Sequence, residues 1–433
     1  MHRKFVIVLR VLSIQLWCMG VGGFAYAQAP NTDTLKLTLP QTEDRFLKNN
    51  LSLIIQRYQV DQAQAGVITA RLFDNPEFSI ANVLYNPETK KVFDMSHDGG
   101  EYSAQLSQLF LTAGKRNKNI KLAQISAQQA QYQFYDMLRT LRFTLHTDFY
   151  KIYFLEQSAK VYQQEISSLS TTLNAFKEQY QKGNIALKEV LRIQSQLYSL
   201  QSEQNDLRDE IDDTQAEFKL LVRAPANSYV EPQTDFSLDG KNPVADMPYQ
   251  RLLDSAYNNR ADLKVAHSAV DYSNINLQLQ KAMAVPDVSV QLAYDKQGSY
   301  IRNYNSAGLA FSLPFFNRNQ GAIKQAKIAI DESKAQLQSQ QDQVESDVAG
   351  SYKSALRLET LYNGFDPKFK DDFNHLITEV MKNYQKHNIS LLEFLDFYDS
   401  YKTNTLQFNT LQLNRINSLE QLNYVTGTPI FKQ

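Results

Sequence analysis

Cysteine and tryptophan are almost absent from this chain of 433 residues. The single examples, Cys18 and Trp17, both lie near the N-terminus. A disulfide bond within the chain is excluded, because a bridge needs two thiols. Glycine and proline are also sparse, with 15 and 12 residues, whereas Gln, Leu, Ala and Lys are plentiful. Since glycine and proline disfavour helices most strongly, this composition favours long helices.

An excess of basic charge is missing as well. The chain has 45 basic and 46 acidic residues, which gives a formal net charge of −1. Nucleic-acid binding depends on Lys and Arg placed against phosphates, so no nucleic acid is expected as a partner. Long apolar runs are lacking after the N-terminus, and no later segment approaches the roughly 20 apolar residues of a transmembrane helix.

The first 27 residues have the pattern of a secretory signal peptide. Basic Arg3, Lys4 and Arg10 surround the start of an apolar stretch, which ends in the small-x-small sequence Ala25-Tyr26-Ala27. This order of charge, short apolar core and small residues is typical of a cleaved signal. A membrane anchor is the alternative, and the short core argues against it. The protein is therefore expected to be exported, either staying free outside the inner membrane or crossing a membrane by another route.

A short motif occurs twice. The sequence YQKGNIALKEVL runs from residue 180 to 191, and YQKHNISLLEFL runs from 384 to 395. The repeat extends over two halves, 28–222 and 249–425, with a C-terminal tail over 426–433. Between the halves lies a proline-rich linker, 223–248, that is not expected to be helical.

Each half is predicted to contain a short helix, a strand pair, a very long helix and a returning helix. Apolar residues recur at coiled-coil spacing in the long helix of the first half, as at Leu138, Leu141 and Leu145. At about 1.5 Å per residue, that helix would be roughly 100 Å long. The expected helices cover about 42–73, 116–182 and 185–222 in the first half, and about 249–283, 319–386 and 389–424 in the second. Pro367 predicts a break inside 319–386.

The repeated motif is interpreted as the turn where each long helix reverses direction. Gly183 with Asn184, and His387 with Asn388, suit the left-handed conformation that ends a helix. Ile185 and Ile389 are expected to pack back as the next helix begins.

Two strand pairs are predicted, over 76–110 and 286–316. In 286–295, Val288, Val290 and Leu292 alternate with small or polar residues, and each strand of about 10 residues suits a tilted crossing of an outer membrane. A soluble sheet packed on a core would show the same alternation. Four strands cannot close a barrel, and open edges are not tolerated in lipid. Two chains would supply eight strands and three chains twelve, and an open lumen favours three.

These features together resemble the TolC family of outer-membrane channel proteins. The tip motif Tyr-x-x-Gly-x-Ile-x-Leu-x-Glu-x-Leu carries the resemblance, and NPEFS (75–79), FLTAGKRN (110–117) and LPFFNRNQGAI (313–323) look most like heavy-metal efflux members. The resemblance implies a mainly α fold with a β-barrel portion, in which long antiparallel α-helical hairpins form a coiled-coil tunnel. Four transmembrane strands per chain would complete a 12-stranded barrel in a homotrimer.

The same resemblance implies partners and site residues. The partners are a periplasmic adaptor of the membrane-fusion type, an inner-membrane RND-type pump and outer-membrane lipid. The adaptor would dock on the tips, and acidic residues would line a gated entrance that favours cations. The tip residues are Gly183, Asn184, Ile185, His387, Asn388 and Ile389; the entrance residues are Glu393, Asp396, Glu189 and Tyr384. The family's entrance arginine is missing near Ile389, which puts that contact in doubt. An ordinary solvated acidic face is the alternative for the acids.

No catalytic or metal-binding constellation is visible. The histidines form no close pair and no HExxH unit, so neither an enzyme, a cofactor nor a preformed metal site is expected. His387 at a tip is interpreted as a turn residue. The expected function is an outer-membrane channel of a tripartite efflux system that carries metal ions or drugs. The alternative is a periplasmic coiled-coil scaffold or adaptor without a membrane barrel.

Overall fold

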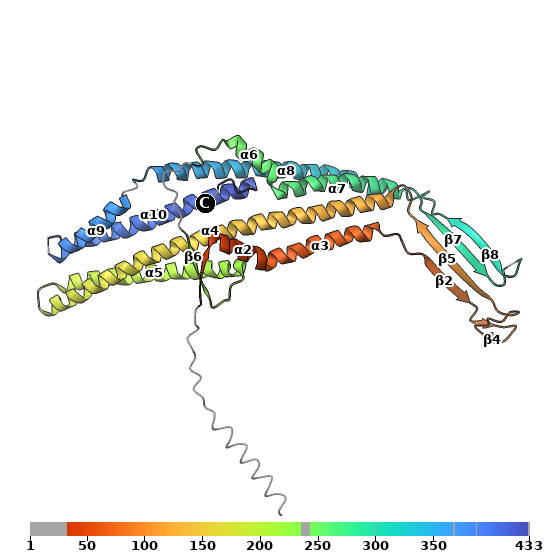
Figure 1. Cartoon of the computed structure of the whole chain (residues 1–433), viewed down its shortest axis with the longest axis horizontal. Helices are drawn as coiled ribbons and strands as arrows, with labels where there is room; N and C mark the ends of the chain where they lie inside the picture. The colour runs from red at the N-terminus through yellow and green to blue at the C-terminus, as the bar shows by residue number, and fades with distance from the viewer. Residues whose placement is uncertain (1–32, 235–242, 299, 367–368, 387, 432–433) are drawn as a thin grey trace, which may run out of the picture.

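The protein is a long rod of helices with a β-sheet at one end and two helical tips at the other (Figure 1). A computed structural model describes residues 33–234, 243–298, 300–366, 369–386 and 388–431. The expected signal peptide, Pro367 and His387 lie outside these residues. Within the described part, no helix is both long enough and apolar enough to cross a membrane.

Nine helices are described. They are α2 (Leu39–Asn49), α3 (Leu51–Arg71), α4 (Lys115–Gln181), α5 (Leu187–Val222), α6 (Tyr249–Asn259), α7 (Ala261–Met283), α8 (Gln320–Asn363), α9 (Phe369–Gln385) and α10 (Leu391–Thr426). The described strands are β1 (Thr34–Thr38), β2 (Glu77–Asn82), β3 (Tyr85–Asn86), β4 (Lys91–Val92), β5 (Tyr102–Phe110), β6 (Tyr229–Gln233), β7 (Val288–Asp295) and β8 (Tyr304–Ala310).

The four-stranded sheet and the helices attached to its strands have their members in the same spatial order. The four-stranded sheet runs β2-β5-β7-β8, and every neighbouring pair is antiparallel. The helices attached to these strands contact one another in the same order, α3 with α4, α4 with α7, and α7 with α8 (Figure 1). The sheet and the helix layer therefore end at matching open edges, β2 with α3 on one side and β8 with α8 on the other.

The long helix α4 has 67 residues and is covered by shorter helices placed end to end. Helix α3 lies along the part of α4 nearer the sheet and α5 along the part nearer the tip, with α2 between them (Figure 1). This agrees with the span expected from the sequence, in which two short helices match one long helix.

The helix before each strand pair is broken in two, although each was expected to be continuous. Asn50 separates α2 from α3, and Arg260 separates α6 from α7; both have extended ψ angles, of 119° and 123°. Asn50 Oδ1 accepts the N–H of Leu53 (3.0 Å), and Asn50 Nδ2 donates to the buried carbonyl of Leu221 (3.0 Å). Asn50 thus caps α3 from within the chain, as asparagine readily does.

The break at Arg260 is stabilised by ion pairs instead. Its guanidinium is almost fully buried and donates to Asp262 (2.6 Å) on α7 and to Asp347 (2.8 Å) on α8. The two breaks occupy the same place in the repeat. Asn50 and Arg260 are as far apart in sequence as the starts of α2 and α6, and Pro76 and Pro286 are separated by the same number of residues.

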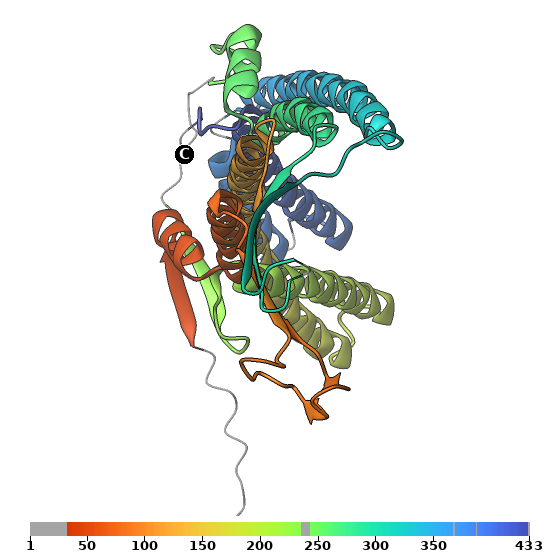
Figure 2. The same cartoon turned by 90° about the vertical axis from the view of Figure 1, so that its right-hand side faces the viewer.

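The segment between the halves is not purely a linker. Strand β6 forms there and pairs in parallel with β1, a short sheet that the sequence did not predict. Val230 of β6 is fully buried, and Gln215 on α5 both donates to its carbonyl (2.6 Å) and accepts its N–H (3.1 Å). Figure 2 shows β1, β6 and α2 standing to one side of the helices. Such a short pair depends on contacts distant in sequence, so periodicity does not reveal it.

The second long helix is interrupted where the sequence indicated. Helix α8 ends at Asn363, Gly364 caps it, and α9 begins at Phe369. The first half has no such break, because α4 runs through to the tip.

Replacing Asn50 with alanine should lower the stability of helices α2 and α3. The change removes the α3 cap and leaves the buried Leu221 carbonyl without its donor, which together should cost about 1–2 kcal/mol. Thermal unfolding followed by circular dichroism at 222 nm measures the loss. The matched control is Asn49→Ala, because Asn49 only donates back to Arg45 O within α2; equal Tm values for the two variants would contradict the capping role.

Candidate functional site

The first helical tip is closed by backbone hydrogen bonds around Gly183. Gly183 has φ of +76°, and a side chain there would meet no atom within 4 Å. Its N–H donates to Tyr180 O (2.9 Å), and the N–H of Asn184 donates to Gln179 O (2.9 Å). Among the described tip residues, only Gly183 is left-handed, so the expectation fails for Asn184 and Asn388.

The second tip repeats the same side-chain bond. Asn184 Nδ2 donates to Gln179 Oε1 (2.7 Å), and at the corresponding place Asn388 Nδ2 donates to Asn383 Oδ1 (3.1 Å). The two asparagines therefore tie each turn to the helix before it. His387 lies outside the described residues.

The isoleucines of the two turns pack inward. Ile185 and Ile389 are half-buried against an apolar cluster that also contains Leu197, Leu200 and Phe394. The apices of both tips remain exposed, because Gly183, Asn184 and Asn388 all face solvent in the single chain.

Tyr384 lies between the two halves. Its ring stacks on Phe394 of α10, with centroids 4.3 Å apart, and on Phe176 of α4, 5.9 Å away. The hydroxyl is buried and has no hydrogen-bond partner among the described residues. Burial, and secondarily the charge of Glu189, raise the pKa of Tyr384 far above its usual range. Tyr180, its counterpart at the first tip, is exposed, so the aromatic contact forms only once in the chain.

Glu393 has a local structural role that the sequence analysis missed, although the Ser-x-x-Glu spacing from Ser390 is the signature of a capping box. Its carboxylate accepts the N–H of Ser390 (2.8 Å) and the Ser390 hydroxyl (2.8 Å), while Ser390 Oγ accepts the N–H of Glu393 (3.3 Å). This is a capping box at the start of α10. These hydrogen bonds from the backbone and side chain of Ser390 lower the pKa of Glu393, which keeps the exposed carboxylate ionised.

The other two acidic candidates are less constrained. Asp396 is exposed one turn after Glu393, as expected for two residues on one helix face. Glu189 occupies the position of Glu393 in the first half, but alanine, Ala186, stands where the second half has Ser390. A capping box with a side-chain hydroxyl therefore cannot form at the first tip.

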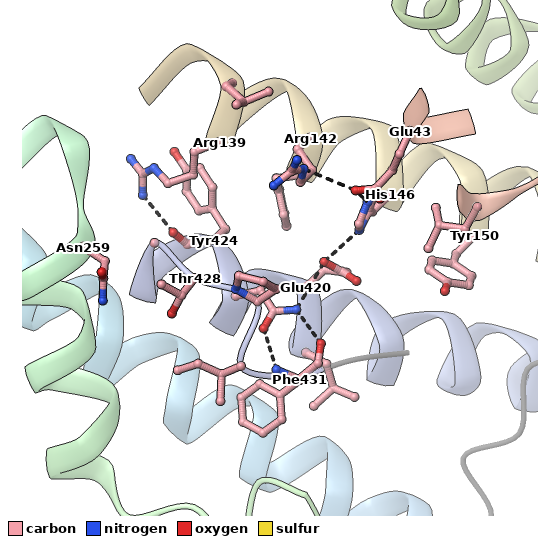
Figure 3. Close-up of a pocket in the computed structure, with 18 of the residues that line it drawn as sticks. Glu43, Arg139, Arg142, His146, Tyr150, Asn259, Glu420, Tyr424, Thr428 and Phe431 are labelled. Atoms are coloured by element: carbon pink, nitrogen blue, oxygen red, sulfur yellow. Dashed lines mark hydrogen bonds and ion pairs between the residues drawn. The ribbon is translucent and has the colours of Figure 1, made fainter. Parts of the chain in front are cut away.

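A polar network at the middle of the rod was missed by sequence reasoning. Figure 3 shows His146 of α4 between two carboxylates, with Nε2 3.0 Å from Glu43 of α2 and Nδ1 3.1 Å from Glu420 of α10. Burial lowers the pKa of His146, but the two acids outweigh burial and raise it to about 9. The ring is therefore charged at neutral pH. Its partners are distant in sequence, so no motif reveals them.

Arg139 continues this network toward the second half. It donates to Tyr424 O (2.8 Å), pairs with Asp136 (2.7 Å) on its own helix and approaches Asp262 of α7 (3.4 Å). Its guanidinium also lies over the Tyr424 ring, 4.2 Å from the centroid. Figure 3 shows Arg139 and Tyr424 among the side chains that line a hollow of about 1540 Å³.

The C-terminal segment lines the same hollow. Asn423 donates to Phe431 O (2.8 Å) and accepts the N–H of Phe431 (2.8 Å), and the Phe431 ring is buried (Figure 3). The tail expected after residue 425 is thus docked against α10 through residue 431.

A second buried polar group lies nearer the tips. Glu165 of α4 is almost fully buried, and burial raises its pKa to about 8 even though Lys402 opposes the shift. Lys402 of α10 pairs with Glu203 of α5 (2.9 Å) and with Asp399 (3.2 Å). The contact with Glu203 joins α5 to α10 near the tips. No cluster of His, Cys, Asp or Glu suited to holding a metal ion occurs among the described residues.

The chain matches a known family model in both halves. The model described as "Outer membrane efflux protein" matches residues 44–222 and 252–428. Among curated proteins, the cobalt-zinc-cadmium resistance protein CzcC of Cupriavidus metallidurans is 21% identical over 300 residues, which is 68% of each chain.

Solved structures share the fold. The outer membrane channel CmeC of Campylobacter jejuni aligns with a TM-score of 0.73 and 14% identity, over 90% of this chain and 85% of that one. The outer membrane protein VceC of Vibrio cholerae aligns with a TM-score of 0.71 and 17% identity, over 90% and 96%.

The His146 network should make stability depend on pH in one direction. Because the folded-state pKa of about 9 exceeds the ordinary value of 6.5, the stabilisation is complete below pH 6.5 and is lost as pH rises through 9. His146→Gln should therefore destabilise the protein by up to about 3 kcal/mol at pH 6 and by much less at pH 9.5. Thermal unfolding at both pH values measures this, with the exposed His267→Gln as control. A His146→Gln deficit that is the same at both pH values would rule out the charged ring as its cause.

Proposed function

This chain belongs to the outer membrane efflux protein family, and from that membership we propose that three copies form one continuous export duct across the outer membrane and the periplasm. The four-stranded sheet would supply one third of a twelve-stranded barrel, and the helices would supply one third of a periplasmic tunnel. The tips would form the tunnel entrance, where a periplasmic adaptor and an inner-membrane RND-type pump engage.

The matching open edges of sheet and helices support this proposal most directly. Strands β2 and β8 each have a neighbour on one side only, and α3 and α8 end the helix layer on the same two sides. Backbone groups on an open edge cannot remain unpaired in lipid. Repeating the four-element unit around an axis satisfies every edge, and twelve strands leave room for a lumen whereas eight fill with side chains.

The exposed side chains of the sheet argue against the alternative of a soluble scaffold. Phe78 and Ile80 on β2 and Leu309 on β8 are each more than 60% exposed. No described helix covers the sheet in Figure 1. A soluble sheet would bury such a face, whereas a lipid-facing sheet exposes it.

The acids near the second tip are proposed to line the entrance. In a trimer, Glu393 and Asp396 would place six carboxylates around a narrow mouth, with Glu189 and Tyr384 beside them. Such a ring attracts cations and repels anions. The lowered pKa of Glu393 favours this role, since the side chain stays charged even in an acidic periplasm.

Cargo is proposed from chemistry and from one relative. CzcC is described as a cobalt-zinc-cadmium resistance protein. Divalent cations suit an acidic entrance, so cobalt, zinc and cadmium ions are the proposed cargo. They would pass through as hydrated ions rather than be chelated, which requires no fixed ligand set in the wall.

Removing the charge of both entrance acids should weaken cation selectivity. Glu393→Gln keeps the Ser390 capping box, because glutamine serves at that position as well as glutamate does. The double variant Glu393→Gln/Asp396→Asn should therefore fold normally and bring the cation-to-anion permeability ratio toward 1 in planar bilayers. The control is Asp44→Asn/Glu231→Gln, which neutralises two acids paired with Lys48 and Lys36 at the middle of the rod. Selectivity that changes equally in both double variants would sink the entrance assignment.

A large charged residue at the first tip should block export without disturbing assembly. A Cβ atom at Gly183 would meet no atom within 4 Å and the residue is exposed, so the main cost of Gly183→Arg is the left-handed strain, about 1–2 kcal/mol. A deletion strain expressing it should grow no better on cobalt, zinc or cadmium than the empty deletion strain, although trimers still form in the outer membrane.

Gly183→Asn is the matched control, because asparagine tolerates the left-handed conformation and adds little bulk. It should restore growth to nearly the wild-type level. Full resistance from Gly183→Arg would remove the tip from the docking role, and a deletion strain with unaltered metal tolerance would remove these metals as cargo.

A further inference from the structure

One buried ion pair fastens the two halves of the chain where the sheet meets the helices. Lys115, the first residue of α4, is buried and lies 2.7 Å from the Asp287 carboxylate just before β7. Asp287 also accepts the N–H of Thr112 (2.8 Å), and Lys115 donates to Val285 O (2.7 Å). The contact joins the end of the first strand pair to the start of the second.

The internal repeat identifies a second place where this junction should occur. Gly114 and Asn319 are equivalent, because each is the left-handed residue immediately before a long helix. Pro76 and Pro286 are equivalent, because each lies just before the first strand of its pair and they are as far apart in sequence as the helix breaks at Asn50 and Arg260. The counterpart of Asp287 is therefore Glu77.

Strand registers check this equivalence independently. Ile80 of β2 lies opposite Ala104 of β5, and their counterparts under the repeat, Val290 and Leu309, lie opposite each other in β7 and β8. The same two spacings thus relate helix starts, prolines and strand pairs. The counterparts of Thr112 and Lys115 are Asn317 and Gln320.

In the single chain this second junction is empty. Glu77, Asn317 and Gln320 are all exposed, whereas Lys115 is buried. Strand β8 also ends early. Residues 108–110 of β5 pair only with β7, the strand of the other half. Their counterparts under the repeat are residues 313–315, which follow β8. These residues would pair with a further strand on the open side of β8, and in one chain β8 stops at Ala310. A second copy supplies the missing strand.

We propose that β8 of one copy extends to Phe315 and pairs antiparallel with β2 of the next copy, with Phe315 opposite Phe78 and Leu313 opposite Ile80. This register carries over the β5–β7 pairing, in which Phe110 lies opposite Val288 and Gln108 opposite Val290. The inference rests on the proposed shared barrel and specifies how its three seams are closed.

The side-chain pattern supports this register over its neighbours. It sets the apolar residues Phe78 and Ile80 against the apolar residues Phe315 and Leu313, on one face. A slip of one residue would move an entire set of side chains to the opposite face.

The seam also has its own polar tie. Glu77 takes the place of Asp287, and the amide side chains of Asn317 and Gln320 take those of Thr112 and Lys115. Both amides use their oxygens within the chain, accepting the N–H groups of Asn319 and Arg318. Gln320 Nε2 already donates one hydrogen to Phe316 O (3.4 Å), so its second N–H and the Asn317 NH₂ group suit the Glu77 carboxylate of the next copy. The tie between copies is thus made of amides, whereas the tie within the chain is an ion pair.

Engineered cysteines test the register. The only native cysteine, Cys18, lies in the expected signal peptide, so the background is thiol-free. In Ile80→Cys/Leu313→Cys, mild oxidation of the full-length protein in outer membranes should convert most chains into covalent dimers and trimers on non-reducing gels. The matched control is Ile80→Cys/Leu309→Cys, on the same face but four residues along the strand, roughly 13 Å further, which is beyond disulfide reach.

The outcomes separate the two proposals. Cross-linking of the first pair alone supports the register. Cross-linking of the control pair instead overturns the register and leaves the shared barrel standing. If neither pair links and the protein still sediments as a trimer in detergent, the β2–β8 seam is wrong. If neither pair links and the protein is monomeric, the shared barrel fails as well.

Discussion

The open sheet edge is the constraint on which the rest of this structure depends. Four strands carry four helices in the same order, so the sheet cannot be closed without also closing the helix layer. In lipid an unpaired row of N–H and C=O groups is too costly to persist. The requirement for backbone hydrogen bonds in the membrane therefore determines the arrangement of helices far from it. It also explains why a long rod, with little core of its own at the sheet end, can be a stable part of a larger assembly.

The internal repeat supplies geometry, and individual residues differentiate the two copies of it. The helix breaks at Asn50 and Arg260 share a backbone conformation but use a cap in one case and ion pairs in the other. At the tips, the second half has a capping box formed by Ser390, whereas the first half has Ala186 at that position and no such box. Only the second long helix is interrupted before its tip. The two hairpins therefore share one geometry but differ in how their helices are capped and interrupted.

Several buried polar side chains in this protein connect helices. His146 links α2, α4 and α10 at the middle of the rod, and Lys402 links α5 and α10 nearer the tips. Because α10 takes part at both levels, it connects the second half of the chain to helices of the first half. Charged pairs of this kind are sensitive to the loss of one partner, since the remaining charge is then left buried. They fix the relative position of helices whose apolar seams alone would permit sliding.

The sequence by itself determined the elements that depend on local periodicity. The long helices, the strand pairs and the two tips follow from apolar spacing, from missing proline and glycine and from the repeated motif, and these are properties of short windows. Family resemblance added the class of protein. Tertiary structure decided what distant residues do together: the β1–β6 pair, the breaks at Asn50 and Arg260, the stacking of Tyr384 and the placing of His146 between Glu43 and Glu420. Each of these depends on contacts between segments tens to hundreds of residues apart, whose free energy no local pattern records.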